Sequence, residues 1–328
     1  MGNTMHNGVP FDDSVRICIG VCTRRRPQLL TQCLVSLNML EEPLGCAVEV
    51  IVVDNNDAPD EQELVETYEV RPDGLPFHYV HEPRLGIAHA RNAVLDKALE
   101  LRADWIGMVD DDQILPWNWL CEMWAAVHEY PADVVKSAVR FVYPTPLPLW
   151  ACPKTRKHKW RLDANMATTN GVLFRSWLAR EDGLALRFND EFNLSSGEDR
   201  DFFKRAYLAG AKIVHTPDAV AEEFMPETKL SFSAQVAREY WQEVTNTRQD
   251  RRFDGFLTAL CFKSSNFLNH MLFGFFYAVT SPVSAVVSRR RARRQLLKGA
   301  KKIAKAAGIA VGLLGFARPE PYRTIHGS

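Results

Sequence analysis

The chain has 328 residues, 46% of them hydrophobic and 24% charged, which is the composition of an ordinary globular protein with room for one large domain and appendages. Lys plus Arg and Asp plus Glu number 40 each, so no overall positive field points to a nucleic acid partner. The seven cysteines include no CxxC pair, which argues against a disulfide scaffold or a zinc ribbon.

The first fourteen residues, Met1–Ser14, are mostly polar and lack the apolar segment of a signal peptide. We therefore expect a flexible N-terminus there, followed by a catalytic part that stays in the cytosol. The charge balance along the chain is uneven, because the last forty residues are basic and the acids lie upstream.

Buried strands are predicted where apolar, often β-branched residues run almost without interruption. These runs are Val15–Cys22, Val48–Val53, Phe77–Val80 and Trp105–Val109. Apolar residues at helical spacing predict helices between or after them, over 28–37 with Pro27 in the first turn, over 87–101 and over 117–130. Strands that alternate with helices predict a doubly wound, mostly parallel α/β sheet.

Carboxylates stand where two of these strands end. Asp54 closes the second run, and Asp110, Asp111 and Asp112 follow the fourth directly. In doubly wound sheets ligands bind beyond the carboxyl ends of the strands. Three adjacent like charges repel one another, and a hard cation such as Mg²⁺ or Mn²⁺ would relieve that repulsion. A solvated acidic turn is the alternative interpretation, since Asp is a common turn residue.

The second half of the chain is less regular. Val134–Val142 and the end of Thr168–Phe174 are predicted strands, and Arg200–Leu208 is a predicted helix that follows Ser195–Asp199. Asp199 is thus placed at a helix N-terminus, where the dipole favours a carboxylate and where it could be a simple N-cap. The basic run Lys154–Arg161 is either a solvated loop or a loop that closes over an anionic substrate.

The C-terminal region changes character. Phe256–Val287 is apolar but interrupted by polar residues and Pro282, and its cleanest part, Met271–Val287, is shorter than the ~20 residues of a membrane span. Arg289–Arg294 and a basic amphipathic stretch follow, which favours attachment to an anionic membrane surface. A membrane span, a buried structural helix and nucleic-acid binding are the alternatives, and the last leaves the apolar neighbour without a role.

Several motifs together resemble the family 2 glycosyltransferases of the GT-A fold, and most closely the bacterial exopolysaccharide enzymes of the succinoglycan type. The resemblance extends from Arg16 to about Ser231. Its parts occur in the family's order: Thr23-Arg24-x-Arg26-Pro27, Val53-Asp54-Asn55, Gly86-x-Ala88-x-Ala90-Arg91-Asn92, Asp110-x-Asp112 with Pro116, Gly197-Glu198-Asp199 with Asp201, and Thr216-Pro217-Asp218.

The resemblance implies a catalytic GT-A domain over residues 15–250, with a nucleotide-binding half (15–115) and an acceptor half (116–250). The basic and apolar composition that follows predicts a helical membrane-associating tail over 251–328. It implies that Asp110 and Asp112 form the DxD motif that holds Mn²⁺ or Mg²⁺. Asp199 would be the catalytic base and Glu198 would contact the acceptor. The residues that would line the nucleotide-sugar site are Thr23, Arg26, Asp54, Arg84, Arg91, Asp110, Asp111, Asn170 and Gly171.

Two departures from the family pattern affect these assignments. Many relatives carry a metal-binding His near the end of the catalytic domain, where this chain has Val220–Phe224, and Glu223 is the candidate replacement. Processive synthases carry Gln-x-x-Arg-Trp, whereas this chain has Gln235-Val236-Ala237-Arg238 with Trp241 displaced. We interpret that near miss as transfer of a single sugar.

Other enzyme classes fit the sequence less well. A dinucleotide-dependent oxidoreductase needs GxGxxG after the first strand, where Gly20 is the only glycine, and no P-loop motif occurs. A sugar-nucleotide nucleotidyltransferase would open with a glycine-rich phosphate loop, which Thr23–Pro27 does not resemble. A membrane-docked scaffold without turnover stays open, although it leaves the retention of Asp110, Asp112 and Asp199 unexplained.

The sequence as a whole predicts an inverting, metal-dependent glycosyltransferase on the cytoplasmic face of a bacterial inner membrane. It would transfer one hexose from a nucleotide sugar, with UDP favoured by the resemblance alone, to a lipid-linked oligosaccharide of an exopolysaccharide. An anionic membrane surface and other polysaccharide-assembly enzymes are the expected partners, and nucleic acid is not.

Overall fold

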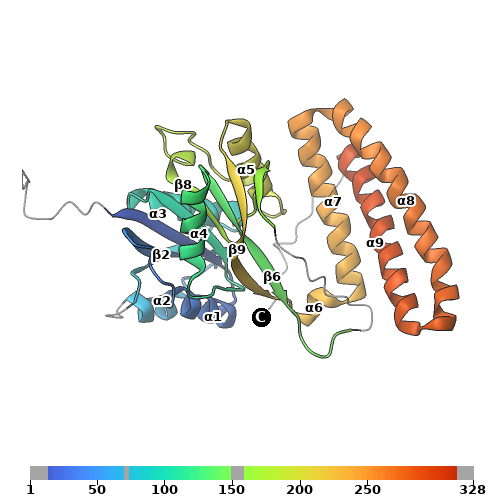
Figure 1. Cartoon of the computed structure of the whole chain (residues 1–328), viewed down its shortest axis with the longest axis horizontal. Helices are drawn as coiled ribbons and strands as arrows, with labels where there is room; N and C mark the ends of the chain where they lie inside the picture. Colours follow the sequence, from blue (N-terminus) through green and yellow to red (C-terminus); the bar gives the residue numbers. More distant parts are fainter. Residues whose placement is uncertain (1–13, 70–73, 149–158, 316–328) are drawn as a thin grey trace, which may run out of the picture.

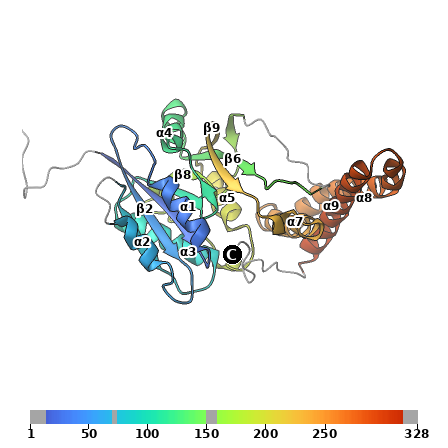
Figure 2. The ribbon, with the colours of Figure 1, turned by 90° about the horizontal axis from the view of Figure 1, so that it is seen from below.

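The computed structural model describes residues 14–69, 74–148 and 159–315. The expected flexible N-terminus lies almost wholly outside these residues, as do Lys154–His158 of the basic run and residues 316–328 of the tail. Figure 1 shows two parts: an α/β unit built on one sheet, and a layer of long helices at the C-terminal end. Figure 2 shows that this layer extends away from the sheet.

The first half of the sheet is parallel, as predicted. Its strands are β1 (Val15–Thr23), β2 (Cys46–Asp54), β3 (Phe77–His81) and β4 (Trp105–Asp110), and they pair in the order β3-β2-β1-β4. Alternate residues of β1 face opposite sides of the sheet and both sides are buried, which explains the uninterrupted apolar runs. All four carboxyl ends therefore meet at one edge.

The second half of the sheet is mixed, while the long ladders keep the sheet mostly parallel, as predicted. Strand β8 (Val172–Arg175) pairs antiparallel with both β4 and β6 (Val134–Val142), and β6 pairs parallel with β9 (Ile213–Phe224). The short strands β5 (Gln113–Ile114) and β7 (Arg161–Ala164) pair antiparallel with β9. Strand β9 continues past the Thr216-Pro217-Asp218 motif to Phe224 and so brings Glu223 to the edge where β4 ends.

Helices cover both faces of the sheet. One face carries α1 (Pro27–Leu37), α2 (Gln62–Glu69) and α4 (Trp119–Glu129), and the other carries α3 (Ile87–Glu100) and α5 (Glu198–Leu208). Apolar residues at helical spacing form the buried stripe of each, such as Leu30, Cys33, Leu34 and Leu37 of α1. Two separate cores result, one on each side of the sheet, and short 3₁₀ turns at Ser176–Leu178 and Asp190–Phe192 lead toward α5.

The C-terminal layer consists of α7 (Phe232–Asp254), α8 (Phe256–Val287) and α9 (Arg289–Leu314), preceded by the single turn α6 (Glu227–Leu230). Helix α9 lies between the other two (Figure 1). The polar residues of Phe256–Val287 do not interrupt the helix, and Pro282 lies inside it, which corrects the expectation of a short, broken apolar run. By length and composition α8 could cross a membrane.

Candidate active site

A cavity of about 320 Å³ opens at the carboxyl ends of β1 and β4. Its walls come from both halves of the sheet, from the start of α3 and α5, and from α6. The predicted residues that line it are Thr23, Arg26, Arg91, Asp110, Asp111, Asp112, Glu198 and Glu223. The sheet edge thus joins side chains that lie up to two hundred residues apart in the sequence.

Asp111 ties the first loop to the end of β4. Its carboxylate accepts hydrogen bonds from Thr23 Oγ1 at 2.9 Å and from Arg26 Nη1 at 3.0 Å, and only 4% of the residue is exposed. Burial raises the pKa of Asp111, while Arg26 and Thr23 act in the opposite direction. Asp111 therefore shapes the floor of the cavity and orients Arg26.

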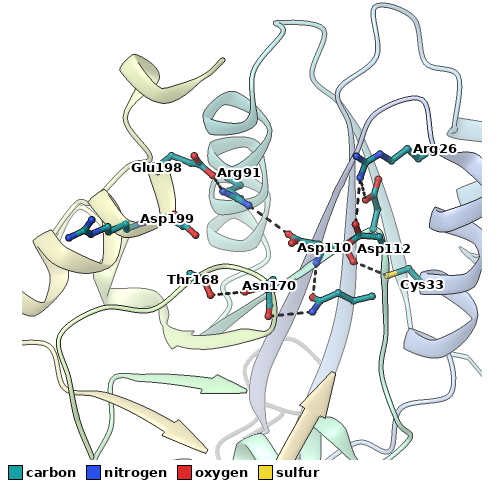
Figure 3. A network of polar contacts seen from close by, with 12 residues as sticks. Arg26, Cys33, Arg91, Asp110, Asp112, Thr168, Asn170, Glu198 and Asp199 are labelled. Atoms are coloured by element: carbon teal, nitrogen blue, oxygen red, sulfur yellow. Dashed lines mark hydrogen bonds and ion pairs between the residues drawn. The ribbon is translucent and has the colours of Figure 1, made fainter. Parts of the chain in front are cut away.

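Arg91 stands between the two groups of carboxylates, as Figure 3 shows. It forms an ion pair with Glu198 and lies 3.7 Å from Asp110 Oδ1. Burial raises the pKa of Glu198 to about 7 and that of Asp110 to about 7, against the influence of Arg91. One guanidinium thus links α3, α5 and β4, with carboxylates on both of its sides.

Asp112 and Glu223 are the remaining carboxylates of the cavity, and Asp112 lies near two cations. Asp112 Oδ2 lies 3.5 Å from Lys229 Nζ and 3.9 Å from Arg26 Nη1. Burial and the nearby Asp112 raise the pKa of Glu223, which also hydrogen bonds with the Asn170 side chain. Among residues 14–69, 74–148 and 159–315, no group of three His, Cys, Asp or Glu side chains converges as a metal-binding set. The predicted set of Asp110, Asp112 and Glu223 lines one cavity without converging that closely, and Asp112 faces Lys229 and Arg26.

Asp199 lies at the second position of α5, beside the cavity-lining Glu198. The N-cap is Gly197, in a left-handed conformation with φ 114°, so Asp199 does not cap the helix. Its Oδ1 accepts a hydrogen bond from the backbone N–H of the next residue, Arg200, at 2.6 Å. In Figure 3 Asp199 and Glu198 lie on the opposite side of the network from Asp110 and Asp112.

Helix α7 holds the segment that carries Glu198 and Asp199. Gln249, 1% exposed, donates from Nε2 to Gly197 O at 2.5 Å, and a Cβ at Gly197 would lie 2.6 Å from that same nitrogen. Arg200 donates to Asn246 Oδ1 at 2.7 Å and to Asp250 Oδ1 at 2.6 Å. These contacts fix where α5 begins, and they were not predicted because α7 itself was not.

A buried lysine supports the loop opposite α5. Lys136 Nζ donates to Ser137 O and Asn170 O at 2.8 Å and to Gly171 O at 3.2 Å. Burial lowers the pKa of Lys136 to about 8, and the fields of Asp110, Glu223 and Asp199 oppose that change. Asn170 and Gly171 are thus held by their carbonyls, and the neighbouring Thr169 lines the cavity in their place.

Two predicted nucleotide-site residues lie elsewhere. Asp54 is fully buried and accepts hydrogen bonds from Asn56 N, Glu61 N and Tyr79 Oη, because the chain turns back over its carboxylate after β2. Arg84 pairs with Glu82 through Nε at 2.9 Å and Nη2 at 2.6 Å, and its side chain is 68% exposed. Neither lines the cavity.

Sequence reasoning missed other residues of the site: Arg24, Asn55, Lys136, Thr169, Ser196 and Lys229. Asn55 lines the cavity, although the adjacent Asp54, which was predicted to do so, does not. The Nδ2 of Asn55 donates to Glu82 O and Arg84 O. Lys136 could have been found, since a lysine inside an apolar strand is unusual. Cys22, expected in the core, reaches the cavity wall, and Lys229 carries no local signal.

The glycosyl transferase family 2 profile matches residues 18–183, half of the chain. A curated relative, the succinoglycan biosynthesis protein ExoM of Rhizobium meliloti (strain 1021), is 32% identical over 241 residues, which cover 72% of this chain and 76% of the relative. The chain belongs to glycosyltransferase family 2. It is a glycosyltransferase, and the matched region contains the cavity-lining residues from Gly20 to Thr169.

Solved structures share the fold of this family 2 enzyme. The mannosyltransferase PcManGT of Pyrobaculum calidifontis, in complex with GDP-Man and Mn²⁺, has a TM-score of 0.60 at 18% identity and covers 94% of this chain and 90% of its own. TarS 1-349 of S. aureus in complex with UDP-GlcNAc has a TM-score of 0.54 at 17% identity, with 92% of each chain covered. The GT-A fold expected from the motifs is confirmed.

Proposed function

We propose that this family 2 glycosyltransferase transfers a single hexose, with inversion, from a UDP-sugar to a lipid-linked oligosaccharide of a bacterial exopolysaccharide. The observation that carries the proposal is that carboxylates lie on opposite sides of Arg91 at one cavity, with Asp110–Asp112 on one side and Glu198, followed by Asp199, on the other. ExoM acts in succinoglycan biosynthesis by its name, which supports the class of product. The preference for UDP rests on the family resemblance.

The first carboxylate group suits a divalent cation. Asp110, Asp112 and Glu223 offer only oxygen ligands, which Mg²⁺ and Mn²⁺ prefer, and such ions keep several waters and substrate oxygens in their coordination shell. Two carboxylates are therefore enough, and a closed set of three is not required. When bound, the cation would offset the negative charge that builds on the departing diphosphate. Arg26 and Lys229 lie close enough to Asp112 to contact the same diphosphate.

The second carboxylate group suits proton transfer. Asp199 would accept the proton of the acceptor hydroxyl at its free carboxylate oxygen, while Oδ1 is held by Arg200 N. Glu198, paired with Arg91, would border the acceptor and keep the guanidinium in place. Attack by the hydroxyl from the side opposite the diphosphate inverts the anomeric carbon, and two separate carboxylate sites fit that division of roles.

The helical layer suits a membrane location. Apolar residues are exposed along α8, and Arg289–Arg294 begins α9. Basic and apolar residues together bind anionic lipid surfaces. The enzyme would then stand at the cytoplasmic face of the inner membrane, near its acceptor and near other polysaccharide-assembly enzymes.

The test is titration calorimetry of UDP into the purified protein with and without Mn²⁺, repeated on Asp112→Asn and on the exposed control Asp218→Asn. We expect binding that needs both the metal and Asp112, and no change in the control. Binding without metal would keep the nucleotide and remove the role of Asp110 and Asp112. Failure to bind UDP, GDP or dTDP would favour a scaffold without turnover.

A further inference from the structure

We infer that α8 lies along the surface of an anionic bilayer, with its axis in the membrane plane, and does not cross the membrane. The inference rests on the proposed membrane association and specifies its geometry. It is carried by the exposure of α8, by the charge of α9 and by the way in which α9 is fixed between α7 and α8.

Helix α8 exposes large apolar side chains along nearly its whole length. In an ordinary soluble domain such residues would be buried, and a contiguous exposed set marks an interaction surface. We call this set the α8 apolar face: Phe256, Leu257, Leu260, Phe262, Leu268, Leu272, Phe273, Phe275, Phe276, Val279, Val283, Val286 and Val287. Helix α8 buries only a narrow stripe that includes Ala259, Lys263, Gly274 and Ser281.

The charge beside this face has one sign. Residues 256–314, which form α8 and α9, contain ten Lys or Arg and no Asp or Glu. Arg289, Arg290, Arg291 and Arg293 are exposed where α8 passes into α9. Clustered cations next to an apolar face are complementary to a bilayer with anionic headgroups, and a protein partner would not require that combination.

Helix α9 is bound to both of its neighbours. Toward α7, Lys301 and Lys305 form ion pairs with Glu239 at 3.4 and 3.0 Å. Toward α8, Lys298 lies over the ring of Tyr277 and Lys302 over the ring of Phe273. The helices also approach closely, since a Cβ at Gly299 would lie 3.0 Å from Gly274 O. Helices α8 and α9 therefore move as one body.

The packing of α9 against α8 decides whether α8 crosses the membrane or lies in its plane. A 32-residue helix is about 48 Å long, more than the ~30 Å of a bilayer core, so α8 has the length to span. A spanning α8 would carry the lysines of α9 into the hydrocarbon, where charged side chains are strongly disfavoured. An in-plane α8 buries its apolar face and leaves α9 on the aqueous side.

Helix α7 connects α8 and α9 to the active site, so the orientation of α8 also determines that of the cavity. It bonds to α9 through Glu239 and to α5 through Asn246 and Asp250. The ammonium of Lys263, from α8, lies 2.7 Å from Glu243 and 3.1 Å from Asp250. An in-plane α8 would thus hold the cavity at a fixed height above the lipid surface.

The test uses sealed vesicles of phosphatidylethanolamine and phosphatidylglycerol, to which the full chain is added from outside. Arg290→Cys, in the first turn of α9 just past the C-terminal end of α8, is treated with a membrane-impermeant maleimide before and after the bilayer is made permeable by a pore-forming peptide. The experiment uses a Cys261→Ser background, because Cys261 lies between Leu260 and Phe262 on the α8 apolar face, and Leu44→Cys, a fully exposed position of the α/β unit, is the reference. We expect positions 44 and 290 both to react fully from outside. Reaction of position 290 only after permeabilisation would mean that α8 spans and would overturn the inference.

A second measurement identifies what covers the α8 apolar face. The double variant Leu272→Ser/Phe276→Ser should weaken vesicle binding more than tenfold, while Leu44→Ser, a fully exposed leucine of the α/β unit, should leave it unchanged. Unchanged binding of the double variant, or a wild-type dimer in solution that the double variant loses, would overturn the inference. Nucleotide binding, measured without vesicles, tests the proposed activity separately.

Discussion

The α/β unit and the C-terminal helical layer differ in where they place their apolar and charged side chains. In the α/β unit apolar side chains fill two cores and the charges gather at one sheet edge. In the helical layer Lys263, Glu243 and Asp250 form ion pairs between helices, and large apolar side chains of α8 face outward. The first arrangement builds a polar cavity inside an ordinary soluble fold. The second needs an apolar surrounding on one side, which is why we assign it to a lipid surface.

The largest effect should come from the α/β unit. Asp199→Asn should lower the transfer rate about 10²–10⁴-fold, because in the proposed mechanism the acceptor hydroxyl loses the group that takes its proton. UDP binding and vesicle binding should stay unchanged, as measured by calorimetry and co-sedimentation. Asp218→Asn, an exposed change of the same chemistry, is the control. An Asp199→Asn enzyme with wild-type turnover would remove this residue from the mechanism.

The pH dependence of metal-supported nucleotide binding tests the same cavity. Because the pKa of Asp110 is raised to about 7, its carboxylate is mostly protonated at pH 6 and mostly ionised at pH 8. A cation needs the ionised form, so UDP affinity in Mn²⁺ should fall about tenfold from pH 8 to pH 6. In Asp110→Asn affinity should be low and flat across this range. A wild-type profile without a slope would contradict the role of Asp110.

The link between the two regions can be weakened at Gln249. Gln249→Leu removes the donor to Gly197 O and should loosen the start of α5, lowering kcat roughly fivefold with little change in UDP affinity. A lower kcat with an unchanged UDP affinity is expected of a positioning residue, since no residue of α7 lines the cavity. Gln242→Leu, an exposed position of the same helix, should change neither quantity. Equal losses in both variants would mean that α7 is only generally destabilised.

The smallest effect concerns the helical layer itself. Gly308→Ala should lower the free energy of unfolding by about 1 kcal/mol or more, since the new Cβ would lie 2.6 Å from Tyr240 O, although Ala is the better helix former. Ala307→Val, at an exposed neighbouring position, adds volume without such a contact. Thermal unfolding of both variants provides the comparison, and stabilisation by Gly308→Ala would show that α7 and α9 are not in close contact there.

The alternation of apolar strands and helices over the first 130 residues was enough to predict the parallel half of the sheet. The reason is local: period and β-branching determine which segments are strands, and parallel strands must expose their carboxyl ends together. The same logic predicted that Asp110 and its neighbours meet a ligand site. The mixed half was not predictable in this way, because the pairing of β8 between β4 and β6 joins segments without a shared pattern.

Side-chain direction was decided by the tertiary structure alone. Asp54 and Asn55 are adjacent in sequence, yet the turn after β2 buries the first and presents the second to the cavity. Lys229 reaches Asp112 only because β9 extends to Phe224 and returns the chain to the sheet edge. The basic residues and the apolar run of the tail could be identified from the sequence. Their separation onto two faces was not, since it depends on α9 packing between α7 and α8.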